Sequence, residues 1–280
     1  MKKLYTAALV AFLFTNCLSA QEELKVQEKY TAHNKGKFFI SWGGNRDSYS
    51  KSDVTFSGEG YRFTVEDMVA HDKPKGWHID YINPSRITIP QTNFRLGYFI
   101  NDHYSVTVGL DHMKYVMTQN QMAKVNGNIN IGSEFDGTYN HELTEMTPEF
   151  LKYEHTDGLN YVHTEVSRFD DISSLFKLPN TDKVQINLTE GLGFGFLYPK
   201  TNTTLLGKER HDDFHTSGYG ISAKAGLNIT FFKHFFIQGE LKGGYINMQD
   251  IRTTQSTTDK AAQDFYFFQK IISFGGVFKI

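Results

Sequence analysis

The chain has 280 residues, of which 15% are aromatic, 24 are Gly and only 6 are Pro. Its formal net charge of −2 leaves no basic footprint for nucleic acid, and its single cysteine, Cys17, rules out disulfides and thiolate metal sites. No stretch approaches the ~18 consecutive apolar residues of a membrane helix. The length is enough for one large all-β domain or two smaller ones.

The first 20 residues have the pattern of a secretory signal peptide. Lys2 and Lys3 precede a short apolar core at 7–14, and "LSA" at 18–20 offers a small-residue cleavage site. Residues 21–36 are polar and charged without a core pattern, so we expect them to form a short periplasmic arm. The exported chain would then contain no cysteine.

From residue 37 onward, apolar and polar residues alternate in long stretches. In the stretch 93–100, Phe94, Leu96 and Tyr98 share one face, opposite Arg95 and Gly97. Period 2 sustained for about ten residues is typical of a transmembrane strand. The pattern predicts eight strands, near 38–48, 92–100, 103–117, 159–169, 185–198, 218–231, 234–248 and 265–280.

A soluble β-sandwich would also alternate, with apolar residues inside and polar residues outside. Two details favour a membrane barrel instead. The polar face of the strands mixes charges with many glycines, which suit a crowded, concave lumen. Aromatic residues gather at the strand ends, as in an interfacial girdle. We therefore predict an all-β fold over 37–280, an antiparallel up-and-down transmembrane β-barrel.

The connections between strands alternate between short and long. Tight turns are predicted at Asn101–Asp102 and around Lys233–His234, with a less regular one at 170–184, whereas 50–92, 118–158, 199–217 and 249–262 are long and polar. Short turns face the periplasm in such barrels and long loops face outward. This arrangement predicts eight strands with long extracellular loops. Ten strands result if 54–65 and 77–89 also cross the membrane. We favour eight, with these residues extending the barrel above the membrane.

The final stretch, "FFQKIISFGGVFKI", is similar to the C-terminal signal that barrel-assembly machinery reads, carried here by Phe274, Phe278 and Ile280. With this stretch and its alternating strands, the chain resembles the small outer-membrane β-barrels of Gram-negative bacteria, the OmpA/OmpX-type superfamily. The resemblance implies location in the outer membrane. The implied partners are outer-membrane lipids and lipopolysaccharide, the assembly machinery during biogenesis, and other outer-membrane proteins that meet the extracellular loops. It implies no activity, because fold does not determine function.

Several charged residues have the parity of the lumen. An eight-stranded barrel has an interior that side chains can fill, and buried charges must pair. We therefore predict a polar network that plugs the lumen, or alternatively a narrow ion or solute path. Its members are Arg95, Asp111, His163, Glu165, Lys224, Glu240 and Lys242.

The stretch "HDDFHTS" at 211–217 is the most suggestive for chemistry. His215 and Ser217 share the parity of the lipid-facing residues, and a His-x-Ser pair near the outer rim resembles the outer-membrane lipid A deacylases. The sequence offers no acidic residue on the neighbouring strand to orient the histidine, because Glu240 has the inward parity. Metal ligation by 211–215 is the third reading, although no rule brings these side chains to one ion.

The remaining histidines, His103, His141, His155 and His234, fall in predicted loops, turns or strand ends, where we expect solvated or interfacial side chains. The sequence thus predicts a non-enzymatic outer-membrane barrel with a structural or surface-interaction role, without cofactor or metal. A component of an outer-membrane complex fits this description. The alternatives are a lipid A-modifying hydrolase and a narrow pore.

Overall fold

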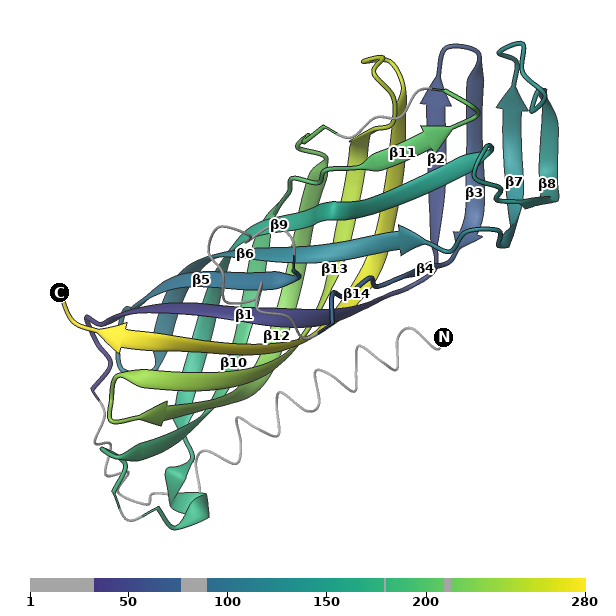
Figure 1. Ribbon diagram of the computed structural model, residues 1–280. Coiled ribbons are helices and arrows are strands. Elements are labelled where there is room, and N and C mark those ends of the chain that lie inside the picture. Colours follow the sequence, from purple (N-terminus) through teal and green to yellow (C-terminus); the bar gives the residue numbers. More distant parts are fainter. Residues whose placement is uncertain (1–32, 77–89, 179, 209–212) are drawn as a thin grey trace, which may run out of the picture. The chain divides into compact units, whose positions relative to one another are not determined.

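In the computed structural model, which describes residues 33–76, 90–178, 180–208 and 213–280, eight antiparallel strands form a ring (Figure 1). β1 pairs with β5 on one side and with β14 on the other, so no edge of the ring is left open. The order around the ring is β1 (Phe38–Tyr49), β5 (Thr92–Phe99), β6 (Tyr104–Met117), β9 (Leu151–Asp171), β10 (Val184–Leu197), β12 (Gly218–Phe231), β13 (Phe235–Arg252) and β14 (Lys260–Phe278).

The eight strands predicted from the alternation are confirmed. They differ from the prediction mainly in length, because β9, β13 and β14 run for 21, 18 and 19 residues. A strand needs only about 9–11 residues to cross a bilayer at the usual tilt. About half of each of these three strands therefore continues beyond a membrane.

Two of the short turns are built by local hydrogen bonds. After β5, the Asn101 side-chain oxygen accepts hydrogen bonds from the backbone N–H of His103 and of Tyr104, at 2.9 and 2.8 Å. Such an Asx turn reverses the chain without glycine. After β12, Phe232 and Lys233 both take the left-handed conformation, with φ of 53° and 66°. Positive φ at two successive positions matches the right-handed twist of the flanking strands.

The third turn, between β9 and β10, contains the 3-10 helix η3 (Ser173–Phe176).

A second group of strands extends the ring on the side of the long connections. β2 (Ser52–Gly58) pairs with β14, and the sheet continues through β3 (Tyr61–Met68) and β7 (Met122–Ile129) to β8 (Gly137–Glu145) (Figure 1). β4 (Ala70–His71) pairs with β6, and β11 (Asn202–Leu205) pairs with β9. We call β2, β3, β4, β7, β8 and β11, with the parts of the ring strands that they pair with, the extension.

The extension confirms one expectation and corrects two others. Residues 54–65 extend the barrel as β2 and β3 beside β14, as expected. The remaining parts of 50–92 and 118–158, expected to be long loops, contain further paired strands. The ten-strand alternative fails for 54–65, because β2 and β3 form a hairpin beside β14 rather than crossing the ring. The other stretch of that alternative, 77–89, lies outside the described residues, as do the predicted signal peptide and nearly all of the predicted periplasmic arm.

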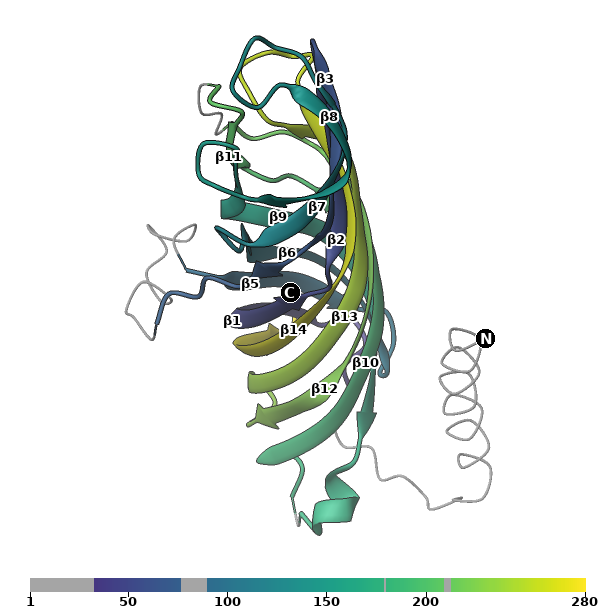
Figure 2. The ribbon, with the colours of Figure 1, turned by 90° about the vertical axis from the view of Figure 1, so that its right-hand side faces the viewer.

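The outer face of the ring is apolar. Leu96, Val108, Phe194 and Ile272 are 48%, 57%, 63% and 64% exposed, each at an outward position of its strand. Such exposure of large apolar side chains around a closed sheet is unfavourable in water and suits lipid. Figure 2 shows neighbouring strands of this wall, β10, β12, β13 and β14, side by side. In the part of the chain that the structure describes, no helix is long and apolar enough to span a bilayer.

The end of the lumen on the side of the short turns is closed by apolar side chains. Phe39, Phe99, Phe169, Phe236 and Val277 are buried in one cluster, which we call the aromatic plug. The ring of Phe39 lies 5.3 Å from that of Phe99 and 6.2 Å from that of Phe236, measured between centroids. Gly97 makes room for it, because a Cβ there would lie 2.1 Å from the Phe39 ring.

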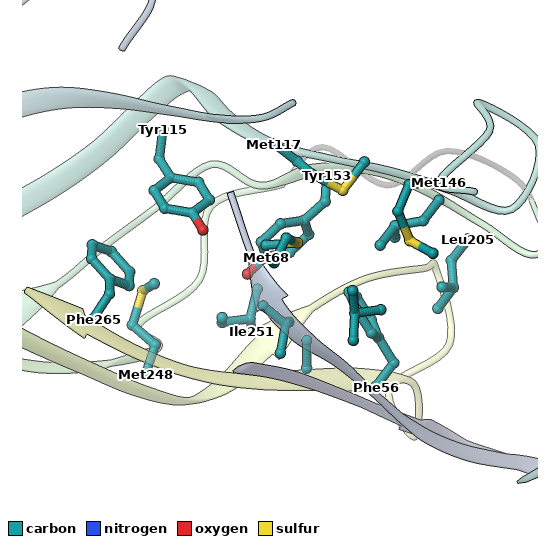
Figure 3. Packing of buried hydrophobic residues seen from close by; sticks show 14 of the residues in the cluster. Phe56, Met68, Tyr115, Met117, Met146, Tyr153, Leu205, Met248, Ile251 and Phe265 are labelled. Carbon is teal, nitrogen blue, oxygen red and sulfur yellow. The ribbon is translucent and has the colours of Figure 1, made fainter. Parts of the chain in front are cut away.

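The extension has a core of its own. Side chains from its strands and from the upper parts of β6, β9, β13 and β14 pack into one apolar cluster, with Phe56, Met68, Tyr115, Tyr153 and Phe265 among its members (Figure 3). Many of these side chains are fully buried. Each buried large apolar side chain contributes about 1.5–3 kcal/mol to folding. The extension is therefore a folded layer rather than a set of solvated loops.

Candidate functional site

The lumen between the aromatic plug and the core of the extension holds a buried ionic network. It consists of Arg95, Asp111, His163, Glu165, Lys224, Glu240 and Lys242, the seven residues to which the alternation assigned inward parity. Arg95 comes from β5, Asp111 from β6, and the others from β9, β12 and β13. The structure brings all seven into one connected set, which we call the lumen network.

Lys242 stands at the centre of the lumen network. Its Nζ lies 2.6 Å from Asp111 Oδ2 and 2.7 Å from Glu165 Oε1, so two carboxylates share its protons. The same ammonium lies 3.3 Å from His163 Nε2 and 5.1 Å from the centre of the Tyr161 ring. The Lys242 side chain is fully buried, and these contacts replace the water that its charge would otherwise keep.

Glu165 joins the remaining cations. Its Oε2 lies 2.8 Å from Lys224 Nζ and 3.3 Å from Arg95 Nε. Lys224 also reaches Glu240 Oε1 at 2.9 Å, and Arg95 Nη2 reaches Asp111 Oδ1 at 2.6 Å. Lys224 and Lys242 are directly opposite each other on β12 and β13. Like charges in this position repel, and Glu165 offsets the repulsion because it contacts both ammonium groups.

The lumen network balances its own charge. Arg95, Lys224 and Lys242 are matched by Asp111, Glu165 and Glu240, and His163 lies between Asp111 and Glu165 at 3.2 and 3.5 Å. Removing one member of such a buried set leaves an uncompensated charge, which costs roughly 3–5 kcal/mol. The set is thus suited to holding opposite walls of the ring together.

Glycines on the inward face give these long side chains their space. At Gly109, an added Cβ would lie 2.6 Å from the His163 ring and 2.8 Å from Arg95 Cδ. The run "GLGFGF" at 191–196 fits the same explanation, because its glycines face inward and Gly193 lies beside Glu165 and Ser222.

No family model matches the chain, and no curated protein matches it. Among solved structures, the chain is similar to the outer membrane protein OprG from Pseudomonas aeruginosa, with 13% identity, a TM-score of 0.39, and coverage of 89% of this chain and 99% of that one. It is also similar to Ail, the attachment invasion locus protein of Yersinia pestis, with 12% identity, a TM-score of 0.32, and coverage of 87% and 99%.

A third similar structure is neisserial surface protein A, with 10% identity, a TM-score of 0.28, and coverage of 84% of this chain and 96% of that one. The fold assignment rests on this chain's own ring, with its apolar outer wall and its charged lumen. The chain is a small β-barrel of the outer-membrane type. Its closed end, short turns and C-terminus lie on one side, and the extension lies on the other.

The His-x-Ser pair has a different geometry from the one expected. Ser217 is only 3% exposed, so the expectation that it faces lipid was wrong. Its hydroxyl donates to the backbone oxygen of His215 at 3.2 Å. The His215 imidazole instead contacts Asp250, with an Nε2–Oδ2 distance of 2.9 Å. This contact holds the pKa of the Asp250 carboxyl below its ordinary value.

Asp250 is therefore the acidic partner of His215 that the alternation pattern did not identify. It lies near the upper end of β13, ten residues beyond Glu240 on the same strand, where alternation gives no guidance. A Ser–His–Asp relay needs the imidazole within hydrogen-bond reach of the serine oxygen. The hydrogen bonds of His215 and Ser217 do not form that relay. His211 and Asp212, from the metal reading of the same stretch, lie outside the described residues.

His155 corrects the expectation of a solvated histidine. It is fully buried in the part of β9 that belongs to the extension, with its Nδ1 2.9 Å from Thr201 Oγ1. The rings of Tyr115 and Tyr153 lie 5.6 and 5.0 Å away. Burial lowers the pKa of His155 from 6.5 to about 3. The error follows from treating 118–158 as a loop.

The residues of the assembly signal lie on the outer wall. Phe274 and Phe278 are 44% and 40% exposed at outward positions of β14, and Ile280 follows the end of that strand. Among the described residues, no group of three or more His, Cys, Asp or Glu side chains has the arrangement of a metal site. Alternation did not predict the aromatic plug, because Phe39, Phe99 and Phe236 are each adjacent to an outward-facing aromatic residue and the pairs were interpreted as an interfacial girdle.

Proposed function

We propose that this chain is an integral outer-membrane protein that presents a folded platform at the cell surface, in a structural or interaction role, rather than a pore or an enzyme. One observation carries the proposal: the extension has an apolar core of its own, continuous with the ring strands. A protein that needed only a membrane anchor would not require strands of 18–21 residues.

The layers of the lumen support the choice against a pore. The aromatic plug, the lumen network and the core of the extension follow one another along the barrel. An eight-stranded barrel is only wide enough for its own side chains. We expect planar-bilayer recordings of the purified protein to show no stable openings. Persistent conductance on the nanosiemens scale would overturn this part of the proposal.

The outer wall supports lipid as the immediate neighbour. An apolar depression of about 640 Å³ lies among β10, β12, β13 and β14, with Leu192, Ile221, Tyr245 and Tyr266 in its lining. Acyl chains suit such an apolar surface, and tyrosines are common on the lipid-facing wall near membrane interfaces. Lipopolysaccharide and other outer-membrane lipids are thus the proposed lipid partners, and the assembly machinery is the proposed partner during insertion.

The outer strands of the extension are the proposed contact surface for other envelope proteins. Leu143 on β8 and Met122 on β7 are 61% and 54% exposed and stand away from the proposed membrane. The test is photo-crosslinking in intact cells, with a photoreactive residue at Leu143 or at Met122. The matched control is Leu192, which is 68% exposed on the lipid face of the ring.

We expect defined protein adducts from the two positions in the extension and only lipid adducts from Leu192. Equal labelling patterns at all three positions would contradict a dedicated contact surface. The enzymatic alternative is tested by Ser217→Ala, which we expect to leave the lipid A acyl pattern unchanged in mass spectra. A retained acyl chain in the Ser217→Ala strain would favour a deacylase.

A further inference from the structure

A cluster of oxygen-bearing side chains lies at the junction between the ring and the extension. Its members are Asn45 and Asp47 on β1, Asp72 directly after β4, Gln91 directly before β5, and Gln269 on β14. Asp47 and Gln269 are directly opposite each other in the pairing of β1 with β14, and both occupy inward-facing positions of their strands. We call these five residues the junction cluster.

The contacts within the junction cluster converge on one amide. Gln91 Nε2 lies 2.6 Å from Asp72 Oδ1, 2.9 Å from Asp47 Oδ2 and 3.2 Å from Asn45 Oδ1. The second oxygen of Asp72 accepts a hydrogen bond from the backbone N–H of Asp47 at 2.9 Å. Two carboxylates from distant parts of the chain thus lie around a single side-chain nitrogen.

The junction cluster has more acceptors than donors. An amide nitrogen carries two hydrogens, so Gln91 cannot satisfy its three oxygen neighbours. Turning the Gln91 amide over would place its oxygen among those same acceptors, which is unfavourable unless a cation lies between them. The hydroxyl of Tyr49, 3.4 Å from Asp47 Oδ2, has a closer acceptor in the backbone oxygen of Lys114 at 2.9 Å.

Three oxygens of the cluster are buried without a hydrogen bond of ordinary geometry. They are Asp47 Oδ1, Gln91 Oε1 and Gln269 Oε1. Gln91 and Gln269 are both fully buried, and the Gln269 amide stands near the Asp47 carboxyl without reaching ordinary hydrogen-bond geometry. A buried polar atom left unsatisfied costs about 1–3 kcal/mol, so three together call for an explanation.

The two carboxyl groups have no cation in direct contact. Neither Asp47 nor Asp72 forms an ion pair with any residue that the structure describes. Arg46, next in sequence, donates to the backbone oxygens of Asn45 and Lys75 at 2.7 and 3.5 Å. The cluster therefore brings two carboxyl groups together with unused side-chain oxygens.

We propose that the junction cluster binds a divalent cation of the calcium type, held by the carboxylates of Asp47 and Asp72 and by the side-chain oxygens of Gln91 and Gln269. Calcium takes about six to eight oxygen ligands in flexible geometry, including carboxylates, amide oxygens and water. Asp72 is half-buried, which leaves access from the extracellular side. Because Asp47 and Gln269 belong to the ring and Asp72 follows the extension, bound calcium would fasten the two together.

Terbium luminescence provides the test, because terbium replaces calcium at oxygen sites and its emission is sensitised by a nearby tyrosine. Tyr49 is suitably placed beside Asp47. The folded protein in detergent is titrated with Tb³⁺ and then with competing Ca²⁺. We expect sensitised emission that Ca²⁺ displaces, and at least a tenfold loss of Ca²⁺ affinity in Asp47→Asn and in Asp72→Asn. Glu59→Gln, at the exposed β2–β3 turn, is the matched control and should change nothing.

Asp72 lies outside the ring strands, so Asp72→Asn decides the matter if Asp47→Asn does not fold. Unchanged Ca²⁺ affinity in the folded Asp72→Asn variant would overturn the proposal. The proposal would also be overturned if the wild-type protein gave no terbium emission that Ca²⁺ displaces. The two carboxyl groups would then share a proton instead of a cation. Thermal unfolding gives a second readout. The midpoint should rise with Ca²⁺ in the wild type and in Glu59→Gln, and should stay constant in Asp72→Asn.

Discussion

Lys242 and Asp111 form a buried ion pair with an Nζ–Oδ2 distance of 2.6 Å, although 131 residues separate them in the chain. Lys242 belongs to β13 and Asp111 to β6, which stand four strands apart in the ring of eight. The pair therefore joins opposite walls of the barrel. Because both side chains are fully buried and join opposite walls, loss of the pair weakens the whole ring rather than one hairpin.

Replacing Lys242 with Met should lower the free energy of unfolding by roughly 3–5 kcal/mol, because Asp111 and Glu165 keep their buried charge. Urea unfolding in lipid vesicles, followed by gel mobility of unheated samples, measures the change. The double variant Lys242→Met/Asp111→Asn restores the charge balance and should recover part of the loss. Leu241→Met, on the lipid face of the same strand, is the control. The charge argument would be contradicted if the double variant lost more free energy of unfolding than the two single variants lose together.

An arginine on the outer wall should cost more than one in the lumen. Val108 is 57% exposed on the outer face, whereas its neighbour Thr107 is 2% exposed and lies opposite Glu165 on β9. Val108→Arg should lose roughly 2–4 kcal/mol if it lies near the bilayer midplane. Thr107→Arg should lose less, because Glu165 can offset the charge. The yield of folded, heat-modifiable protein compares the two, and the reverse order would mean that inside and outside are interchanged.

The ring and the members of the lumen network could be predicted because both follow from the alternation of apolar and polar residues along each strand. Arg95, Glu165 and Lys242 have inward parity in long regular strands, so their side could be assigned before their distances were known. Of the extension, only β2 and β3 could be predicted in the same way, from the alternation of 54–65. β7 and β8 could not, because they are short and β8 is exposed on both faces. Asp250 and Asp72 were missed because strand ends and connections have no period.

Acid should loosen the extension through His155. Its pKa is about 3 when folded and 6.5 otherwise, so protons bind the unfolded form more tightly. The contribution to stability is complete above about pH 6.5 and falls by about 1.4 kcal/mol per pH unit as pH drops toward 3. Near-ultraviolet circular dichroism of the neighbouring tyrosines should therefore weaken as the solution is acidified. His155→Asn cannot titrate in this range and should flatten the dependence; an equal dependence in both proteins would refute the assignment.

Truncating a core residue of the extension should loosen that layer while leaving the ring folded. Phe56 is fully buried on β2, and Phe56→Ala should cost about 3–5 kcal/mol of local stability. Trypsin cleavage after Arg62, on the adjoining strand β3, reports the opening. Phe194→Ala, whose ring is 63% exposed on the lipid face, should leave cleavage unchanged. If both variants resist trypsin equally, the extension is not an independent cooperative layer.

The orientation of the barrel in the outer membrane is tested most directly by single-cysteine labelling of intact cells. The only native cysteine, Cys17, lies in the predicted signal peptide, so the parent protein provides the background. Glu59→Cys, at the tip of the β2–β3 hairpin, should react with a membrane-impermeant maleimide in intact cells. Lys233→Cys, in the tight turn between β12 and β13, should react only after the outer membrane is permeabilised. Equal labelling of both positions in intact cells, or recovery of the protein in the soluble periplasmic fraction, would contradict an outer-membrane barrel with its extension at the cell surface.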